Sequence, residues 1–195
     1  MLDDKKLKEV ENRIKIYIAD GIIKTKEAVE FTDFFLKHST NFLNSAKAEY
    51  LLSTNKDASQ KLGFLNYDGF IVVVNSGYYS MFHMARALLE SKGIKIKTEH
   101  SVHSVTFDAL VYFFYLNKKI EKKLIESFAE SLEESAEIQG QQRAAEMMND
   151  FLFEKRKRST FTYSMGSEIV EAKAKTSLNR AIKFHEELKS FLINK

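Results

Sequence analysis

The chain has 195 residues, and its 30 Lys and Arg against 27 Asp and Glu give a formal net charge of +3, too small to indicate nucleic-acid binding by itself. Cysteine is absent, which excludes disulfides, thiolate metal sites and cysteine nucleophiles. Because proline is also absent and glycine occurs only seven times, the tight turns of a β-rich fold are scarce and the composition favours an all-α fold.

The N-terminal third is expected to form two helices. The first spans residues 5–20, where apolar residues recur about once per helical turn and predict one buried stripe. Gly21 is expected to end this helix. Apolar spacing predicts a second, long helix over 25–53, and the polar stretch 54–66 is expected to be a loop.

Residues 68–92 are apolar on nearly all sides and are expected to form the central, most buried helix. The β-branched run 70–74 would favour a strand by propensity. The length of the apolar segment, and its unbroken continuation to Leu89, favour a buried helix instead. His83 lies inside this segment, where a hydrogen-bonded core histidine is the usual interpretation, and Gly93 is expected to end the helix.

The C-terminal half reads as three further helices. The first covers 101–116 and is expected to be capped by Ser101 or Ser104. A long charged helix is predicted over 119–154, an interruption follows, and a final helix is predicted over 167–192. With no internal repeat and no obvious linker, the economical interpretation is a single all-α domain over residues 1–195.

The N-terminal sequence predicts no targeting segment. Residues 1–6 are charged and lack the apolar run of a signal peptide. The most apolar segment, 70–74, is far shorter than the roughly 20 residues that cross a bilayer. We therefore expect a cytoplasmic protein without a membrane partner.

The clearest charged feature is the basic run Lys155, Arg156, Lys157 and Arg158, which precedes the aromatic-containing segment 159–163. Cations at a helix C-terminus complement the helix dipole and usually stay solvated. The alternative is phosphate binding, because Arg presents a planar fork of donors to phosphate and aromatic rings stack on unpaired bases. From the residues alone, both interpretations stay open.

Other candidate chemistry is weak. His100 and His103 are three residues apart and could share a helix face as metal ligands, but no third ligand has matching spacing, so capping and surface roles are favoured. His185 lies on the apolar stripe of the last helix and is expected in the core. Glycine-rich phosphate loops, His-Glu-x-x-His patterns and nucleophile elbows are absent from the sequence, so no metal or cofactor is expected.

Three short segments occur in an order that resembles a known family. Residues 78–89 read Tyr-Tyr-Ser-Met-Phe-His-Met-Ala-Arg-Ala-Leu-Leu, residues 97–102 read Lys-Thr-Glu-His-Ser-Val, and Arg158 precedes Tyr163 by five positions before the last helix. Together they resemble the HEPN domain family, in its small prokaryotic branch. The resemblance divides the chain into an N-terminal helical extension, 1–40, and a HEPN core, 41–195.

The resemblance implies an antiparallel helical bundle that pairs as a homodimer. Many HEPN members are metal-independent ribonucleases that carry an Arg, four to six residues and then a His, with two copies meeting in one composite site. Here Tyr163 takes the His position after Arg158. With an ordinary pKa of about 10, Tyr is a poor base at neutral pH. Arg158 and Tyr163 remain the candidate catalytic pair, and binding of RNA or nucleotide by residues 155–158 ranks ahead of cleavage.

The resemblance also implies an alternative function. Other members are encoded beside a small nucleotidyltransferase and form toxin–antitoxin pairs with it. The Arg-x4-Tyr variant is common in this branch, so Tyr163 is a candidate acceptor of a nucleotidyl group. The alternative is therefore a non-catalytic helical partner of such an enzyme, and an inert structural bundle is the third possibility.

Overall fold

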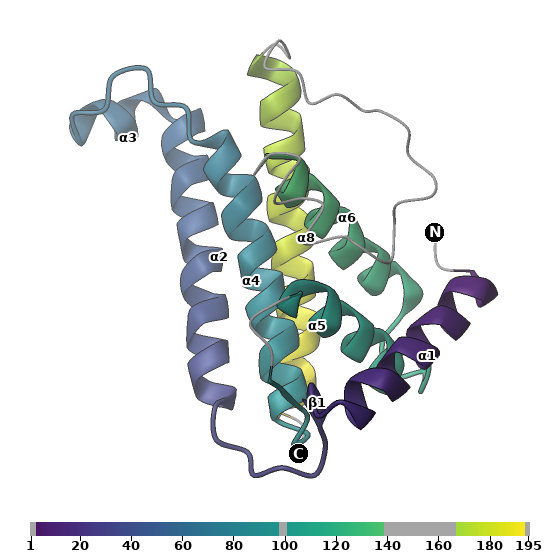
Figure 1. Ribbon diagram of the computed structural model, residues 1–195. Helices are drawn as coiled ribbons and strands as arrows, with labels where there is room; N and C mark the ends of the chain where they lie inside the picture. The colour runs from purple at the N-terminus through teal and green to yellow at the C-terminus, as the bar shows by residue number, and fades with distance from the viewer. Residues whose placement is uncertain (1–2, 98–100, 139–166, 194–195) are drawn as a thin grey trace.

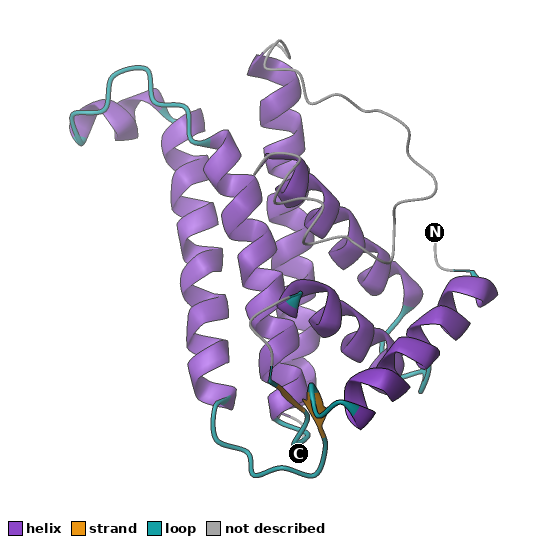
Figure 2. Ribbon diagram, viewed as in Figure 1, coloured by secondary structure: helices purple, strands orange, loops and turns teal. Residues whose placement is uncertain are grey.

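The computed structural model describes residues 3–97, 101–138 and 167–193, which are mostly helical (Figure 2). The elements follow the chain as α1 (Asp4–Ala19), β1 (Ile23–Lys24), α2 (Thr32–Thr54), α3 (Lys56–Lys61), α4 (Phe70–Glu90), β2 (Lys95–Ile96), α5 (Val102–Leu110), the π-helical turn η1 (Val111–Tyr115), α6 (Lys122–Ile138) and α8 (Ser167–Ile193). The predicted all-α bundle is confirmed in this part of the chain. The expected boundary at residue 40 falls inside α2.

Helix α4 lies at the centre of the bundle, in contact with α2, α5, α6 and α8 (Figure 1). It is buried along almost its whole length, so the prediction of a buried central helix over 68–92 is confirmed. Burial on both sides favours a helix over the strand propensity of the run 70–74. Gly77 lets α8 approach closely, because a Cβ there would lie 3.2 Å from the Ser177 hydroxyl oxygen.

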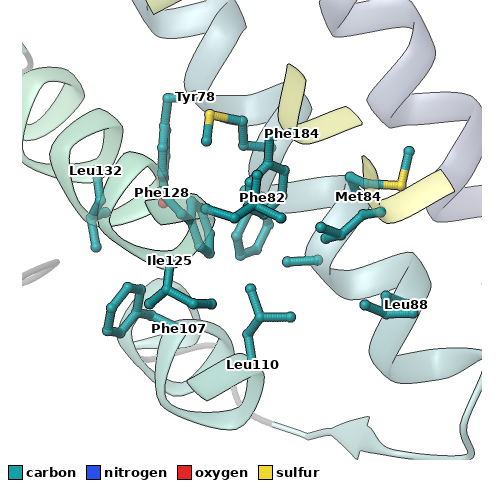
Figure 3. Packing of buried hydrophobic residues seen from close by; sticks show 14 of the residues in the cluster. Tyr78, Phe82, Met84, Leu88, Phe107, Leu110, Ile125, Phe128, Leu132 and Phe184 are labelled. Atoms are coloured by element: carbon teal, nitrogen blue, oxygen red, sulfur yellow. The ribbon is translucent and has the colours of Figure 1, made fainter. Parts of the chain in front are cut away.

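The core on the α6 side of α4 is aromatic (Figure 3). Phe128 of α6 packs between Phe107 of α5 and Phe184 of α8, with ring centroids 5.9 and 5.2 Å away. Its ring also stacks on Tyr78 of α4 at 6.2 Å. These rings hold four helices around one apolar centre.

Helix α1 spans Asp4–Ala19, one residue earlier at each end than the predicted 5–20. The Asp3 carboxylate caps it by accepting a hydrogen bond from the Lys6 amide at 3.0 Å, and Gly21 follows its end at φ +71°. Arg13 attaches α1 to α5 through two hydrogen bonds to the buried Asp108 carboxylate, at 2.7 and 2.9 Å. The N-terminal helix therefore packs on the bundle through an ion pair as well as apolar contacts.

Helix α2 starts seven residues later than predicted. Residues 25–31 form a non-helical connection after β1, which pairs with β2 in a two-stranded antiparallel sheet. The buried Glu90 carboxylate then accepts hydrogen bonds from the backbone amides of Glu30 and Phe31, each at 3.2 Å, and so ends the connection just before α2. These partners are about 60 residues apart, which local spacing does not reveal.

Two smaller expectations also differ from the structure. The predicted loop 54–66 contains α3, which Asn55 caps by accepting from the Ala58 amide at 3.0 Å. Ser101 stands at the N-cap of α5, but it has φ +56° and makes no side-chain capping bond, and the Ser104 hydroxyl donates to the Ser101 carbonyl instead. The expected capping of this helix is therefore wrong.

The two C-terminal helices agree with the sequence where they are described. The predicted helix 119–154 is confirmed over α6, and its remainder and the interruption after it lie outside the described residues. The final predicted helix, 167–192, corresponds to α8. Within the described ranges, we find no helix whose length and apolar character would let it span a membrane.

Candidate functional site

The basic run predicted to bind phosphate, Lys155, Arg156, Lys157 and Arg158, lies between α6 and α8 in the sequence, and Tyr163 follows it. All five residues fall outside the described part of the chain. The structure therefore gives no geometry for this predicted site. A candidate site does form from described residues, and it is built on the same motif that carries the family resemblance.

Within the motif 78–89, Tyr79, His83 and Arg86 share one face of α4. Their spacing of four and three residues brings them onto the same side of a helix. All three are only partly buried, whereas most of their neighbours in the motif are buried in the core. This polar and aromatic face lies beside α2 and the first turn of α5.

Four rings from α2 and α4 alternate in a stack, which we call the ring column: Phe35, His83, Phe42 and Tyr79. Successive centroids lie 6.1, 5.4 and 5.3 Å apart, with interplanar angles of 27°, 6° and 26°. The guanidinium of Arg86 covers the Phe35 end at 4.7 Å from the ring centroid. The column joins α2 to α4 with near-parallel rings.

His83 differs from the expected hydrogen-bonded core histidine. Its Nδ1 is buried, and no hydrogen-bond partner for it exists among the described residues. Burial, helped by the nearby His38 and Arg86 side chains, lowers the pKa of His83 to about 4. At neutral pH His83 is therefore an uncharged ring within the column.

His103 also departs from its expected surface or capping role. It is partly buried at the start of α5, with its ring 4.4 Å from Phe82 and edge-on to Tyr79 at 6.0 Å. Its Nδ1 is hydrogen-bonded to the hydroxyl of Tyr78. His100, its predicted neighbour on the same face, lies outside the described residues.

The Tyr78–His103 hydrogen bond fixes which imidazole nitrogen carries the proton. Burial raises the pKa of Tyr78 well above its usual value, so the phenol keeps its proton. The phenol has no other acceptor in the described ranges, so it donates to Nδ1 of His103. Burial and the Arg86 charge lower the pKa of His103 to about 4. The neutral ring therefore carries its proton on Nε2 and is a donor there.

Arg86 is a partly buried cation with no carboxylate within 4.0 Å in the part of the chain that the structure describes. Besides its position over the Phe35 ring, its guanidinium makes one hydrogen-bonding contact among the described residues, a long one of 3.5 Å to the Ile96 carbonyl. Glu90, one turn further along α4, is engaged by backbone amides and by Lys95 at 3.9 Å. Burial lowers the pKa of Arg86 and the charge of the nearby Glu90 partly offsets this, and a guanidinium stays charged in proteins.

The arrangement combines a guanidinium that has no carboxylate within 4.0 Å among the described residues, a neutral imidazole N–H and flat aromatic rings. We call Arg86 and His103 together the Arg86–His103 pair. Such donors suit an anionic group, and the rings suit a planar one. The described residues hold no group of three or more His, Cys, Asp or Glu that fits a metal ion. The chemistry of this face is therefore that of anion and ring binding.

His185 has a purely structural role, in contrast to His83 and His103. It is buried on α8, and its Nδ1 is hydrogen-bonded to the Ser39 hydroxyl of α2 at 2.9 Å. The predicted core role is confirmed. Among the described residues, His185 has no ring partner of the kind that surrounds His83, so the two environments differ.

Comparisons with known proteins give no match: no family model, no curated protein and no solved structure matches the chain. The HEPN assignment therefore rests on the motif resemblance alone.

Proposed function

We propose that the chain is a HEPN-type protein that binds RNA or a nucleotide through phosphate. The observation that carries the proposal is Arg86, a charged and partly buried guanidinium without a carboxylate partner in the described ranges. His103 adds an N–H donor, and the Arg86 charge lowers the pKa of His103. Phosphate offers several acceptor oxygens to a guanidinium and an imidazole N–H at once.

Partial burial strengthens this attraction. A charge–charge interaction in a partly desolvated site is several times stronger than the same interaction in bulk water. The charge of Arg86 contributes to the lowered pKa values of both His83 and His103. An anion bound at the Arg86–His103 pair would offset that positive potential, so the site favours anionic ligands.

The basic run 155–158 supports the same function from the sequence. Arg156 and Arg158 are proposed to contact further phosphates of the ligand, so substituting both by Ala should weaken RNA binding. Binding ranks ahead of cleavage because Tyr163 occupies the position of the family's general base. Incubation with total RNA, alone and beside Arg158→Ala, separates a ribonuclease from a binding protein.

The assembly proposed is a homodimer that brings two Arg158–Tyr163 segments together, as the resemblance implies. Light scattering at micromolar concentration should give about twice the mass of 22.6 kDa. A mass equal to that of one chain contradicts the dimer but leaves phosphate binding by Arg86 unaffected.

The direct test measures the affinity for a short single-stranded RNA at increasing salt for the wild type, Arg86→Gln and Lys183→Gln. Lys183 is an exposed cation on α8, paired with Glu187 at 3.4 Å, and serves as the matched loss of one charge. Arg86→Gln should weaken binding and reduce its salt dependence, because one phosphate contact is lost. Equal affinities for the two variants would contradict a phosphate site at Arg86.

A second candidate function, binding to a nucleotidyltransferase, is favoured by apolar residues exposed near α3. Leu62, Phe64 and Leu65 follow this helix, which projects from one end of the bundle (Figure 1). Ile71 and Val72, at the start of α4, are exposed as well. Co-purification with a nucleotidyltransferase encoded next to the gene, lost in Leu65→Ser, would support this partner role.

A further inference from the structure

The two-stranded β1–β2 ribbon carries three lysines on one face. Its register places Lys24 of β1 directly opposite Lys95 of β2. The Lys97 amide continues the ladder by donating to the Ile22 carbonyl at 2.8 Å. Directly opposite residues of an antiparallel pair project from the same face, and so do residues two apart along one strand. Lys24, Lys95 and Lys97 therefore share one face of the ribbon, which we call the lysine face.

The other face of the ribbon anchors it to the core. Ile23 and Ile96 form the second cross-strand pair, and both are buried. Because side chains alternate between the two faces of a strand, burial of this pair turns the lysine face outward. Lys24 and Lys97 are exposed accordingly, and Lys95 is partly buried.

Only one of the three lysines forms an ion pair among the described residues. Lys95 is engaged by Glu30 at 2.6 Å and by Glu90 at 3.9 Å. Lys24 and Lys97 have no carboxylate within 4.0 Å in the ranges that the structure describes. Lys24 also lies directly opposite Lys95, and like charges in that arrangement destabilise a sheet. An anionic ligand on the lysine face would offset this cost.

Arg86 lies at the free edge of the same ribbon. Its guanidinium contacts the Ile96 carbonyl at 3.5 Å, and Ile96 is flanked by Lys95 and Lys97. In a trans peptide, the carbonyl and the amide that follows it point in opposite directions. The Lys97 amide points to β1, so the Ile96 carbonyl and Arg86 lie on the side away from β1. The phosphate site proposed at Arg86 is therefore a direct neighbour of the lysine face.

We propose that the ligand at Arg86 is a single nucleic-acid strand whose backbone continues across the lysine face, where Lys24 and Lys97 bind the phosphates that follow. The inference rests on the proposed function and adds the class of ligand, because that function leaves RNA and a free nucleotide open. A mononucleotide carries phosphate at one position, whereas a strand presents one phosphate per nucleotide. Diagonal neighbours such as Lys24 and Lys97 lie about 7–8 Å apart in a sheet, the scale on which phosphates repeat along an extended strand.

Lysine contacts predict affinity without base preference. A lysine ammonium is a compact point charge, and the phosphate oxygens that it binds are the same in every nucleotide. Each phosphate neutralised in a single strand releases counterions and adds about 0.7 to the slope of log affinity against log salt. Binding is therefore expected to strengthen with strand length until the strand spans Arg86 and the lysine face.

The experiment measures the affinity of the full-length protein for a short single-stranded oligoribonucleotide at increasing salt. The wild type is compared with the double variant Lys24→Gln with Lys97→Gln. The control, Lys56→Gln with Lys61→Gln, loses two exposed lysines of α3, which lies at the opposite end of the bundle from β1 (Figure 1). The lysine-face variant should reduce the salt slope by about 1.4, because two phosphate contacts of about 0.7 each are lost. The control should keep the wild-type slope.

Two further ligands assign the loss to the path of a strand. Affinity for a mononucleotide should be the same in the lysine-face variant and the control, because a single phosphate at Arg86 does not reach the lysines. Inorganic tripolyphosphate has several charges but not the length of a strand, so it should behave like the mononucleotide. Thermal melting checks that each variant folds, and the melting midpoint of Lys24→Gln should not fall, because a like-charge pair is removed.

The outcomes separate the inference from the proposed function. Equal salt slopes for the lysine-face variant and the control, with Arg86→Gln weaker, overturn the strand path and leave phosphate binding at Arg86 intact. Loss of tripolyphosphate binding in the lysine-face variant would indicate a compact polyphosphate site and would also overturn the inference. No binding of any of these ligands by the wild type overturns both the inference and the proposed function.

Discussion

Three histidines illustrate how burial sets chemistry residue by residue. His83, His103 and His185 all have pKa values lowered to about 4, and burial is the main cause for each. Only their neighbours differ: a ring column, a tyrosine hydroxyl and a serine hydroxyl. The sequence predicts the core position of His185, but the surroundings of the other two depend on α2 and α5 meeting α4.

These lowered pKa values make the stability of the fold depend on pH. As the pH falls from about 6.5 to about 4, the unfolded chain binds a proton at each histidine while the folded chain does not. The free energy of unfolding is therefore highest above about pH 6.5 and decreases across this window. Urea unfolding at several pH values measures this decrease.

His185→Gln provides the control for that measurement, because it removes one of the three titrating groups. Its unfolding free energy should change less steeply with pH than that of the wild type. A wild-type stability that stays constant from about pH 6.5 to about pH 4.5 would contradict the burial of these rings.

At the scale of elements, local pattern identifies the helices and non-local pairing decides their ends. The apolar spacing of residues 5–20 and 68–92 locates α1 and α4 closely, because each helix presents its buried face through its own sequence. The late start of α2 and the β1–β2 sheet depend on Glu90 and on residues 95–96, far along the chain. The sequence does not predict the ring column for the same reason: its rings alternate between two helices.

Gly93, in the turn after α4, packs closely against Glu27 in the connection before α2, so a side chain at position 93 should lower the stability of the fold. It has φ +67°, and a Cβ would lie 2.7 Å from the Glu27 carbonyl oxygen. Gly93→Ala should therefore destabilise the fold by more than the roughly 1–2 kcal/mol of left-handed backbone strain alone. Gly63→Ala has a similar φ of +82° but open space around the Cβ, so it should cost only the strain.

Denaturant unfolding of both variants tests this difference. Equal losses of stability in Gly93→Ala and Gly63→Ala would show that the connection before α2 does not pack against the turn after α4.

At the scale of the whole molecule, one core around α4 supports the candidate site. The rings on the outer face of α4 are held in place by core residues on its inner face, including Tyr78, which bonds to His103. The composition of the sequence predicts the helical fold class, and its apolar pattern predicts the central helix. The predicted phosphate-binding run at 155–158 stays a prediction, because it lies outside the described residues.

Core substitutions in α4 should act on the whole fold. Leu88 is fully buried, so Leu88→Ala should cost about 2–5 kcal/mol of unfolding free energy. Leu65, which is 78% exposed, provides the matched control, and Leu65→Ala should change stability by about 0.5 kcal/mol or less. Calorimetric or urea unfolding that gave similar losses for both would contradict the central position of α4.

The most direct test of phosphate binding observes the imidazole nitrogens of His103 by NMR during titration with a mononucleotide. In the free protein, the spectrum should show the proton on Nε2. On titration, the His103 Nε2 signals should shift, while those of His185, buried against Ser39, should not. Unchanged His103 signals at ligand concentrations that saturate binding would contradict a phosphate site at the Arg86–His103 pair.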